Sequence, residues 1–197
     1  MKINWFSPLP PLRTEIANNT MRVIEALAQK ALPQETDPLL KDLKKILVAF
    51  DGSLLPALPR MLWALWLDED HKAAKLHLEF DLLKGVPTQA SLTDANENEK
   101  TILRKKLSPG KIYVLDAGYA QYSLLEDILK AKSSFVCRLR DNAVWETFSQ
   151  KELSPQDRNA GIQRDLLVRL GSKIKQDELS IPVRVIEIHH VDPVPRQ

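Results

Sequence analysis

Between residues 46 and 139 the sequence alternates between strand-like and helix-like patterns, and the order of these patterns constrains the fold. The expected order is strand 46–50, strand 76–80, strand 86–92, helix 95–106, strand 112–115, helix 120–131 and strand 134–139. Pro56 and Pro59 predict a loop over residues 52–60, and Asp94 with Glu97 predicts a capping box at the start of the helix 95–106. The first three strands follow one another without a long helix, so they can form an antiparallel meander. The last two are joined through a helix and should therefore run parallel.

Composition places few other limits on the chain. Its 197 residues can bury one core with an added lobe, and the 44% hydrophobic and 27% charged residues are typical of a soluble globular protein. A net charge of +2 permits a nucleic-acid partner without indicating one. The apolar stretch 61–67 is too short to span a membrane, and a single cysteine, Cys137, excludes an internal disulfide.

Two aspartates follow strand patterns that lie far apart in the sequence. Asp51 follows the apolar run 46–50, and Asp116 follows the run 112–115; a small residue comes after each of them. Such positions can aim carboxylates out of a sheet edge, where the pair could share divalent metal ions. The alternative is structural, because an aspartate at a strand end often caps a helix or forms a turn.

The chain divides into three expected segments. Residues 1–44 form a short helical N-terminal segment, and residues 45–142 form an α/β segment. Residues 143–197 form a β-rich segment with strands expected at 143–149, 162–170 and 181–191 and a polar turn around Ser154. In the last of these strands the alternation shifts by one residue after Val185, which predicts a bulge. The fold class is α/β: the pattern order indicates an RNase H-like mixed sheet with flanking helices, followed by the β-rich insertion.

Four short segments together resemble the DDE-type transposases of the group named for insertion sequence four. They are residues 48–53 (VAFDGS), 74–81 (AKLHLEFD), 116–119 (DAGY) and 135–142 (FVCRLRDN). None is specific alone, but their order and spacing are, and the resemblance extends over residues 51–142, about half of the chain. The resemblance implies an RNase H-like catalytic core, residues 45–142, that is interrupted by a β-rich insertion. It also implies that residues 1–44 are part of a DNA-binding region, and that residues 143–197 are this insertion, incomplete at its C-terminal end.

By this resemblance Asp51 and Asp116 are the first two members of a catalytic carboxylate triad and ligands of Mg²⁺ or Mn²⁺. It also implies that Arg138 and Lys75 contact the DNA backbone, and that glycines 52 and 118 let DNA approach closely. For Arg138 the alternative is a surface charge or an ion pair with Asp141. The implied partner is double-stranded DNA, both transposon ends and target. A homodimer, no membrane association and a cytoplasmic, nucleoid-associated location are further expectations.

The family's third acidic residue, a glutamate on a later helix, has no counterpart in this sequence. The expectation is therefore a partial copy of a transposase, which leaves enzymatic activity open. Two alternatives remain. One is a non-catalytic fragment that binds DNA or a full-length transposase. The other is an unrelated RNase H-like nuclease that recruits Glu79 or Asp81.

Overall fold

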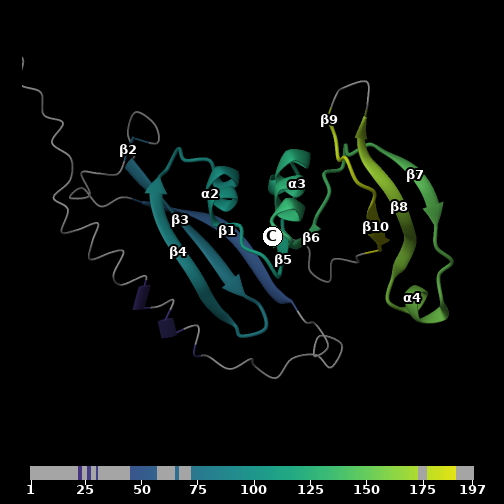
Figure 1. Ribbon diagram of the computed structural model, residues 1–197, viewed down its shortest axis with the longest axis horizontal. Coiled ribbons are helices and arrows are strands. Elements are labelled where there is room, and N and C mark those ends of the chain that lie inside the picture. The colour runs from purple at the N-terminus through teal and green to yellow at the C-terminus, as the bar shows by residue number, and fades with distance from the viewer. Residues whose placement is uncertain are drawn as a thin grey trace, which may run out of the picture. The chain divides into compact units, whose positions relative to one another are not determined.

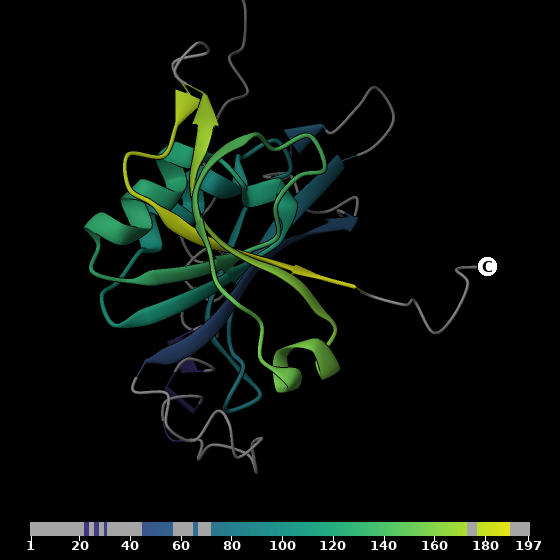
Figure 2. The same cartoon turned by 90° about the vertical axis from the view of Figure 1, so that its right-hand side faces the viewer.

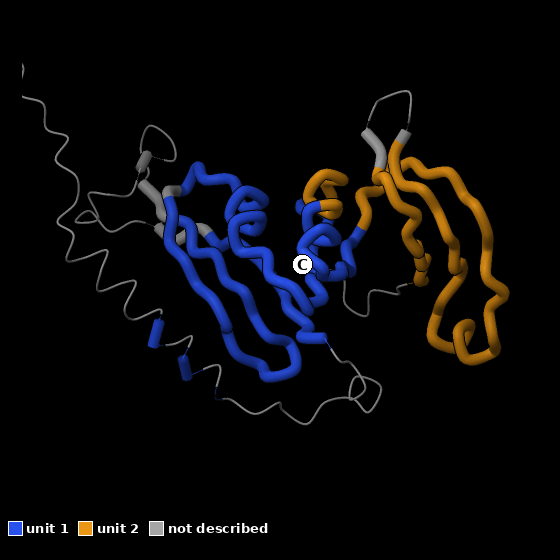
Figure 3. The backbone as a smooth tube through the Cα atoms, viewed as in Figure 1, with its two compact units in different colours: residues 1–119, 127–138 blue, residues 120–126, 139–197 orange. Residues whose placement is uncertain are grey.

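The computed structural model consists of two compact units, each considered by itself (Figure 3). Unit 1 holds residues 1–119 and 127–138, and unit 2 holds residues 120–126 and 139–197. The structure describes residues 22–23, 26–27, 30, 45–56, 65–66, 72–172 and 177–189. Most of the expected N-terminal segment 1–44 lies outside these residues, and the bounds expected for the three segments stay predictions.

Unit 1 is built on a mixed β-sheet (Figure 1). Its strands are β1 (Ile46–Pro56), β2 (Leu65–Trp66), β3 (Lys72–Asp81), β4 (Val86–Asp94), β5 (Lys111–Leu115) and β6 (Ser134–Cys137). β3 pairs antiparallel with β1, β2 and β4, whereas β1, β5 and β6 run parallel. The path β4–β3–β1–β5–β6 is an antiparallel meander joined to two parallel crossovers, so the expected RNase H-like mixed sheet is confirmed.

Two helices accompany the sheet. They are α2 (Glu99–Lys106) and α3 (Tyr122–Lys130), and the short 3₁₀ turn η2 (Ala117–Tyr119) precedes α3. The guanidinium of Arg104 on α2 donates to the Asp127 carboxylate on α3 at 2.9 Å. Within the described residues neither helix, nor any other, could cross a membrane.

The start of α2 differs from the expected one. The sequence indicated a capping box at Asp94 and Glu97, but Asp94 is the last residue of β4 and pairs with Ala74. The N-cap is Asn98, whose side chain accepts a hydrogen bond from the Lys100 amide at 2.9 Å. Pairing across the β3–β4 hairpin extends the strand through the position where local capping would start a helix.

β1 is also longer than expected. Residues 52–60 were predicted to be a loop because of Pro56 and Pro59, but β1 continues to Pro56. Its pairing with β3 runs on through Pro56 and Ala73, while its pairing with β5 ends at Ala49. A proline is tolerated at such a strand end, where few ladder hydrogen bonds are needed. The result is a strand that extends well past Asp51.

The buried side of β3 is its polar side. His77, Glu79 and Asp81 are at most 4% exposed, whereas the alternating Leu76, Leu78 and Phe80 are only half-buried. Each polar residue has a partner within unit 1. His77 shares a 2.8 Å hydrogen bond with the Thr93 hydroxyl, Glu79 accepts from Lys111 at 2.6 Å, and Asp81 accepts from two turn amides. Because these side chains have hydrogen-bond and ion-pair partners, the polar face of β3 can be buried.

Burial of His77 makes stability depend on pH. Desolvation lowers the pKa of His77 below 6.5; the charges of Lys75 and Lys106 lower it further, and those of Glu99 and Glu97 oppose this. A histidine with a lowered pKa binds its proton more weakly in the folded state, so its contribution to stability is lost as pH falls below about 6.5. We expect the free energy of unfolding, measured in urea, to fall by up to about 1.4 kcal/mol for each pH unit below about 6.5. In His77→Gln this fall should be smaller. An unchanged slope in His77→Gln would contradict this.

Unit 2 is β-rich, as expected. It contains β7 (Trp145–Gln150), α4 (Pro155–Asn159), β8 (Ile162–Ser172), β9 (Asp177–Glu178) and β10 (Val183–Ile188). β8 pairs antiparallel with β7, β9 and β10. The region around Ser154, expected as a polar turn, is a short helix with a Ser154–Asp157 capping box (Figure 2). The last strand contains a bulge, as expected, but the register shifts between Glu187 and Ile188, two residues after the predicted position.

Candidate active site

The register of the sheet brings Asp51 and Asp116 to the same edge. Ala49 on β1 is paired with Val114 on the parallel strand β5. Asp51 and Asp116 each lie two residues further along, and both side chains are exposed. Because neighbouring parallel strands lie about 4.8 Å apart, a continuation of this register would set the two aspartates level with one another. Their role as metal ligands stays a prediction.

Arg138 continues this row. Leu115 is paired with Cys137 on the parallel strand β6, and the Arg138 amide donates to the Leu115 carbonyl at 3.1 Å. Arg138 is exposed, and among the described residues its side chain has no ion pair with Asp141. Asp116 and Arg138 thus directly follow the carboxyl ends of β5 and β6, while Asp51 lies within the neighbouring strand β1.

Lys75 has a different environment. Its amine lies 3.2 Å from Glu99 Oε1 and donates to the Glu97 carbonyl at 3.1 Å, and its side chain is only 14% exposed. Lys75 therefore holds the start of α2 against β3. The DNA contact expected of Lys75 stays a prediction, and its amine would have to leave Glu99 to make it.

Two aromatic rings pack against Phe50, the residue that precedes Asp51 on β1. Phe50 stacks on the His77 ring with 6.3 Å between centroids, and meets the Tyr119 ring edge-on at 6.1 Å. Phe50 and Tyr119 are at most 4% exposed. This packing joins the residue before Asp51 to the turn that follows Asp116.

Glu99 is the polar centre of this region, and sequence reasoning missed it. The Tyr119 hydroxyl donates to Glu99 Oε2 at 2.9 Å. Burial, and then this bond, raise the pKa of Tyr119, so the phenol remains a donor at neutral pH. A methyl group placed on Gly52 would come within 2.7 Å of Glu99 Cδ. A glycine inside a strand pattern signals such a close approach, but here it was interpreted as room for DNA.

The carboxylates of Asp51 and Asp116 offer oxygen atoms as possible metal ligands at this edge of the sheet. Within the described residues no group of three or more His, Cys, Asp or Glu side chains could hold a metal ion together, so a third acid does not join Asp51 and Asp116 there. Glu79 and Asp81 do not fill this place: Glu79 is opposite Phe50 in the register, on the buried face, and both carboxylates are already hydrogen-bonded. The positions of Glu79 and Asp81 therefore give no support to the alternative of a nuclease that recruits them.

Cys137, at the end of β6, has a thiol suited to a structural position. Burial raises the pKa of the Cys137 thiol to about 11, and the charge of Asp116 adds to this effect. The thiol is therefore protonated at neutral pH, which matches the expected inert cysteine.

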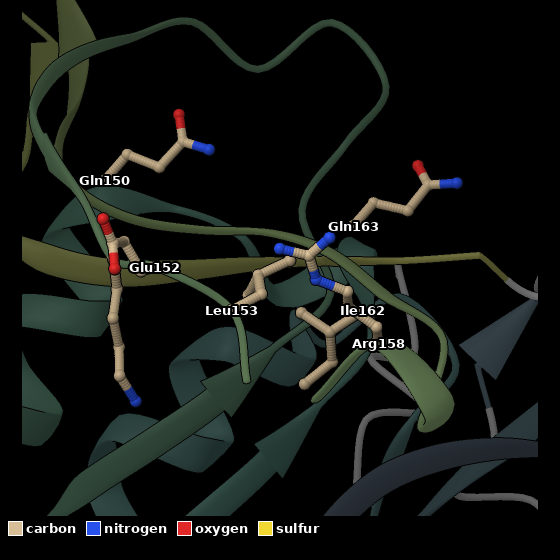
Figure 4. Close-up of a pocket in the computed structure, with 7 residues that line it drawn as sticks. Gln150, Glu152, Leu153, Arg158, Ile162 and Gln163 are labelled. Carbon is tan, nitrogen blue, oxygen red and sulfur yellow. The ribbon is translucent and has the colours of Figure 1, made fainter. Parts of the chain in front are cut away.

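A separate hollow of about 780 Å³ lies in unit 2. Its lining includes Gln150, Glu152, Arg158 and Gln163, and Figure 4 shows Glu152 and Arg158 on opposite sides of it. None of the residues singled out from the sequence lines this hollow. The candidate site is therefore the edge of the sheet in unit 1.

The comparisons with known proteins agree with the family expected from the sequence. The chain is 29% identical over 123 residues to a Sinorhizobium fredii protein named "Putative transposase y4zB", covering 61% of this chain and 34% of that protein. The chain thus spans about a third of that relative's length.

Solved structures give weaker likenesses. A piggyBac transposase synaptic complex with hairpin DNA matches with a TM-score of 0.43 and 11% identity, over 98% of this chain and 42% of that one. The Mos1 transposase paired-end complex matches with a TM-score of 0.33 and 12% identity, over 68% and 45%. The family model described as "Transposase DDE domain" matches residues 42–191, which is most of the chain. The chain therefore belongs to the transposase DDE domain family.

Proposed function

We propose that this chain provides Asp51 and Asp116 as metal ligands for Mg²⁺-dependent cleavage and transfer of DNA strands in transposition. The observation that supports the proposal is the register of β1 and β5: Asp51 and Asp116 are exposed, and each stands two residues beyond the paired residues Ala49 and Val114 on neighbouring parallel strands. Membership of the transposase DDE domain family supports it. The insertion-sequence-four group, the homodimer and the nucleoid location stay predictions.

The donor set fits a hard divalent cation. Mg²⁺ prefers one or two carboxylates and keeps several waters, and Mn²⁺ accepts the same oxygen ligands. When bound, the metal would activate the attacking oxygen and stabilise the leaving oxygen of a phosphodiester. The two aspartates would hold the metal. The packing of Phe50 against Tyr119 joins the part of β1 that carries Asp51 to the turn that begins at Asp116.

A supercoiled plasmid incubated with the chain tests the activity. We expect conversion to the nicked form in Mg²⁺, none in the presence of a chelator, and none in Asp51→Ala. Nicking that persists unchanged in Asp51→Ala would contradict the assignment of this site.

The second candidate function is DNA or transposase binding without cleavage. It is favoured by one observation: within the described ranges, no third acid stands with Asp51 and Asp116. A site with two ligands would bind metal more weakly and position it less well. Metal binding at Asp51 and Asp116 without any nicking would select this candidate, and nicking lost in Asp51→Ala would select the catalytic one.

Arg138 is the cation best placed to contact DNA phosphates beside the two aspartates. We expect Arg138→Ala to weaken binding to duplexes of different sequence about equally, because a phosphate contact carries no sequence information. The slope of log Kd against log salt concentration should decrease by about one. Fluorescence anisotropy over a salt series measures both quantities.

Arg164→Ala is the matched control for that measurement. Arg164 lies in unit 2 and is held by Glu187 in a bidentate pair. The expected slope for Arg164→Ala is that of the unaltered chain. Equal slopes for Arg138→Ala and the unaltered chain would overturn the Arg138 contact.

A further inference from the structure

Glu99 lies where four segments of unit 1 meet. It is the first residue of α2, and its side chain is 30% exposed. Its carboxylate meets the Lys75 amine of β3 at 3.2 Å and accepts from the Tyr119 hydroxyl of η2 at 2.9 Å. The same side chain lies over the backbone of β1 at Gly52, with Cγ, Cδ and Oε1 all within 2.9 Å of where a Cβ would stand.

Two of these contacts adjoin the aspartates of the site. Gly52 is the residue directly after Asp51. Tyr119 closes the turn that begins at Asp116, because its amide donates to the Asp116 carbonyl at 2.9 Å. The Tyr119 ring also meets Phe50, the residue directly before Asp51. Glu99 therefore touches the residue directly after Asp51 and also touches Tyr119, whose amide is bonded to the Asp116 carbonyl, so it connects β1 with the Asp116 turn.

We propose that Glu99 is a positioning residue that fixes the part of β1 around Asp51 against the Asp116 turn, so that both carboxylates keep the spacing needed to share metal. The inference rests on the proposed function and deepens it. Glu99 is not assigned as a ligand, because its carboxylate oxygens are occupied by Lys75 and Tyr119.

The glycine at position 52 fits this role. Any side chain there would push the Glu99 carboxyl away from Lys75 and Tyr119, since the overlap involves Cγ and Cδ as well as an oxygen. Gly118 offers a contrast within the same region: a Cβ added there meets nothing within 4 Å. The requirement for glycine at position 52 therefore comes from Glu99.

The test uses the full chain and the series Glu99→Ala, Glu99→Gln and Tyr119→Phe. Two quantities are measured: the Mn²⁺ dissociation constant, and the hydrogen-exchange rate of the amide of residue 119. We expect Glu99→Ala to weaken Mn²⁺ binding about tenfold, the lower range for loss of a group that supports metal ligands. Exchange at residue 119 should rise by a similar factor in the absence of metal. The amide oxygen of Glu99→Gln can still accept from the Tyr119 hydroxyl. Its Mn²⁺ affinity and its exchange rate at residue 119 should therefore both lie between those of Glu99→Ala and the unaltered chain.

Asp127→Asn is the matched control. It removes another carboxylate that ties α2 to a neighbouring segment, through Arg104, but it touches neither Gly52 nor the Asp116 turn. We expect it to lower the unfolding midpoint about as much as Glu99→Gln while leaving Mn²⁺ affinity and exchange at residue 119 unchanged.

The outcomes separate the inference from the proposed function. If Glu99→Ala and Asp127→Asn give the same Mn²⁺ affinity and the same exchange rate, the positioning role is overturned and the metal site stands. If Asp51→Asn binds Mn²⁺ as tightly as the unaltered chain, the proposed function fails and the role of Glu99 toward metal fails with it. Faster exchange at residue 119 in Glu99→Ala would then still support a structural link to the turn.

Discussion

Replacing Asp51 or Asp116 by asparagine is expected to reduce Mn²⁺ affinity by at least about a hundredfold. Asparagine keeps the size of the side chain but removes the charge that a hard cation needs. Loss of a group that only supports a metal ligand already costs about 10–100-fold, and loss of the ligand itself should cost at least as much. Isothermal titration with Mn²⁺ measures the affinity, and the two single variants should have similar effects because the aspartates share one site.

The stability of these variants serves as their internal control. Both aspartates are exposed, so the substitutions should change the free energy of unfolding by less than about 0.5 kcal/mol. Asp127→Asn, which removes a carboxylate elsewhere in unit 1, should bind Mn²⁺ as the unaltered chain does. An equal loss of affinity in all three variants would indicate a general charge effect and contradict a specific site.

Glu79→Gln is expected to produce the largest loss of stability. The Glu79 carboxylate is 1% exposed, and its Oε1 accepts from Lys111 at 2.6 Å and from the Thr88 hydroxyl at 2.8 Å. Lys111 is itself only 12% exposed, so its charge would lose its buried partner. Breaking a buried ion pair from one side costs about 3–5 kcal/mol, and urea unfolding should show a decrease of this size.

Two further variants test the cause of that loss. In Glu79→Met combined with Lys111→Met both charges disappear, so most of the stability should return. Glu187→Gln breaks the Arg164–Glu187 pair, whose arginine is 51% exposed, and should cost less than about 1 kcal/mol. A double variant less stable than Glu79→Gln alone would contradict this explanation.

The order of elements and the parallel pairing of the strands that carry Asp51 and precede Asp116 could be predicted from the sequence. Both follow from local patterns: apolar runs that end at an aspartate, and a helix between two strands, which makes the strands parallel. Parallel neighbours present their carboxyl ends at one edge, so residues 65 positions apart in the chain could be placed together.

The buried face of β3 could not be predicted in this way. Alternation in the 76–81 segment gives two faces, and hydrophobicity favours burying Leu76, Leu78 and Phe80. The structure buries the polar set because Glu79 finds Lys111, a partner 32 residues away. Such a pairing depends on the register of three strands, which no local pattern contains.

Glu99 escaped prediction for a related reason. The nearby Asp94 and Glu97 matched a capping box and directed attention to the wrong helix start, whereas Asn98 is the N-cap. Because the start of the helix was misplaced, the sequence did not predict which way the Glu99 side chain points. Its contacts with Gly52 and Tyr119 join residues that are far apart in the sequence, so they became visible only in the folded chain.

The most direct measurement is the anomalous scattering of Mn²⁺ in crystals of the chain grown with that metal. The account predicts a peak between the Asp51 and Asp116 carboxylates, within about 2.0–2.3 Å of an oxygen of each, as expected for divalent metal and carboxylate ligands. Mn²⁺ bound only elsewhere, with these two carboxylates turned away from each other, would contradict it.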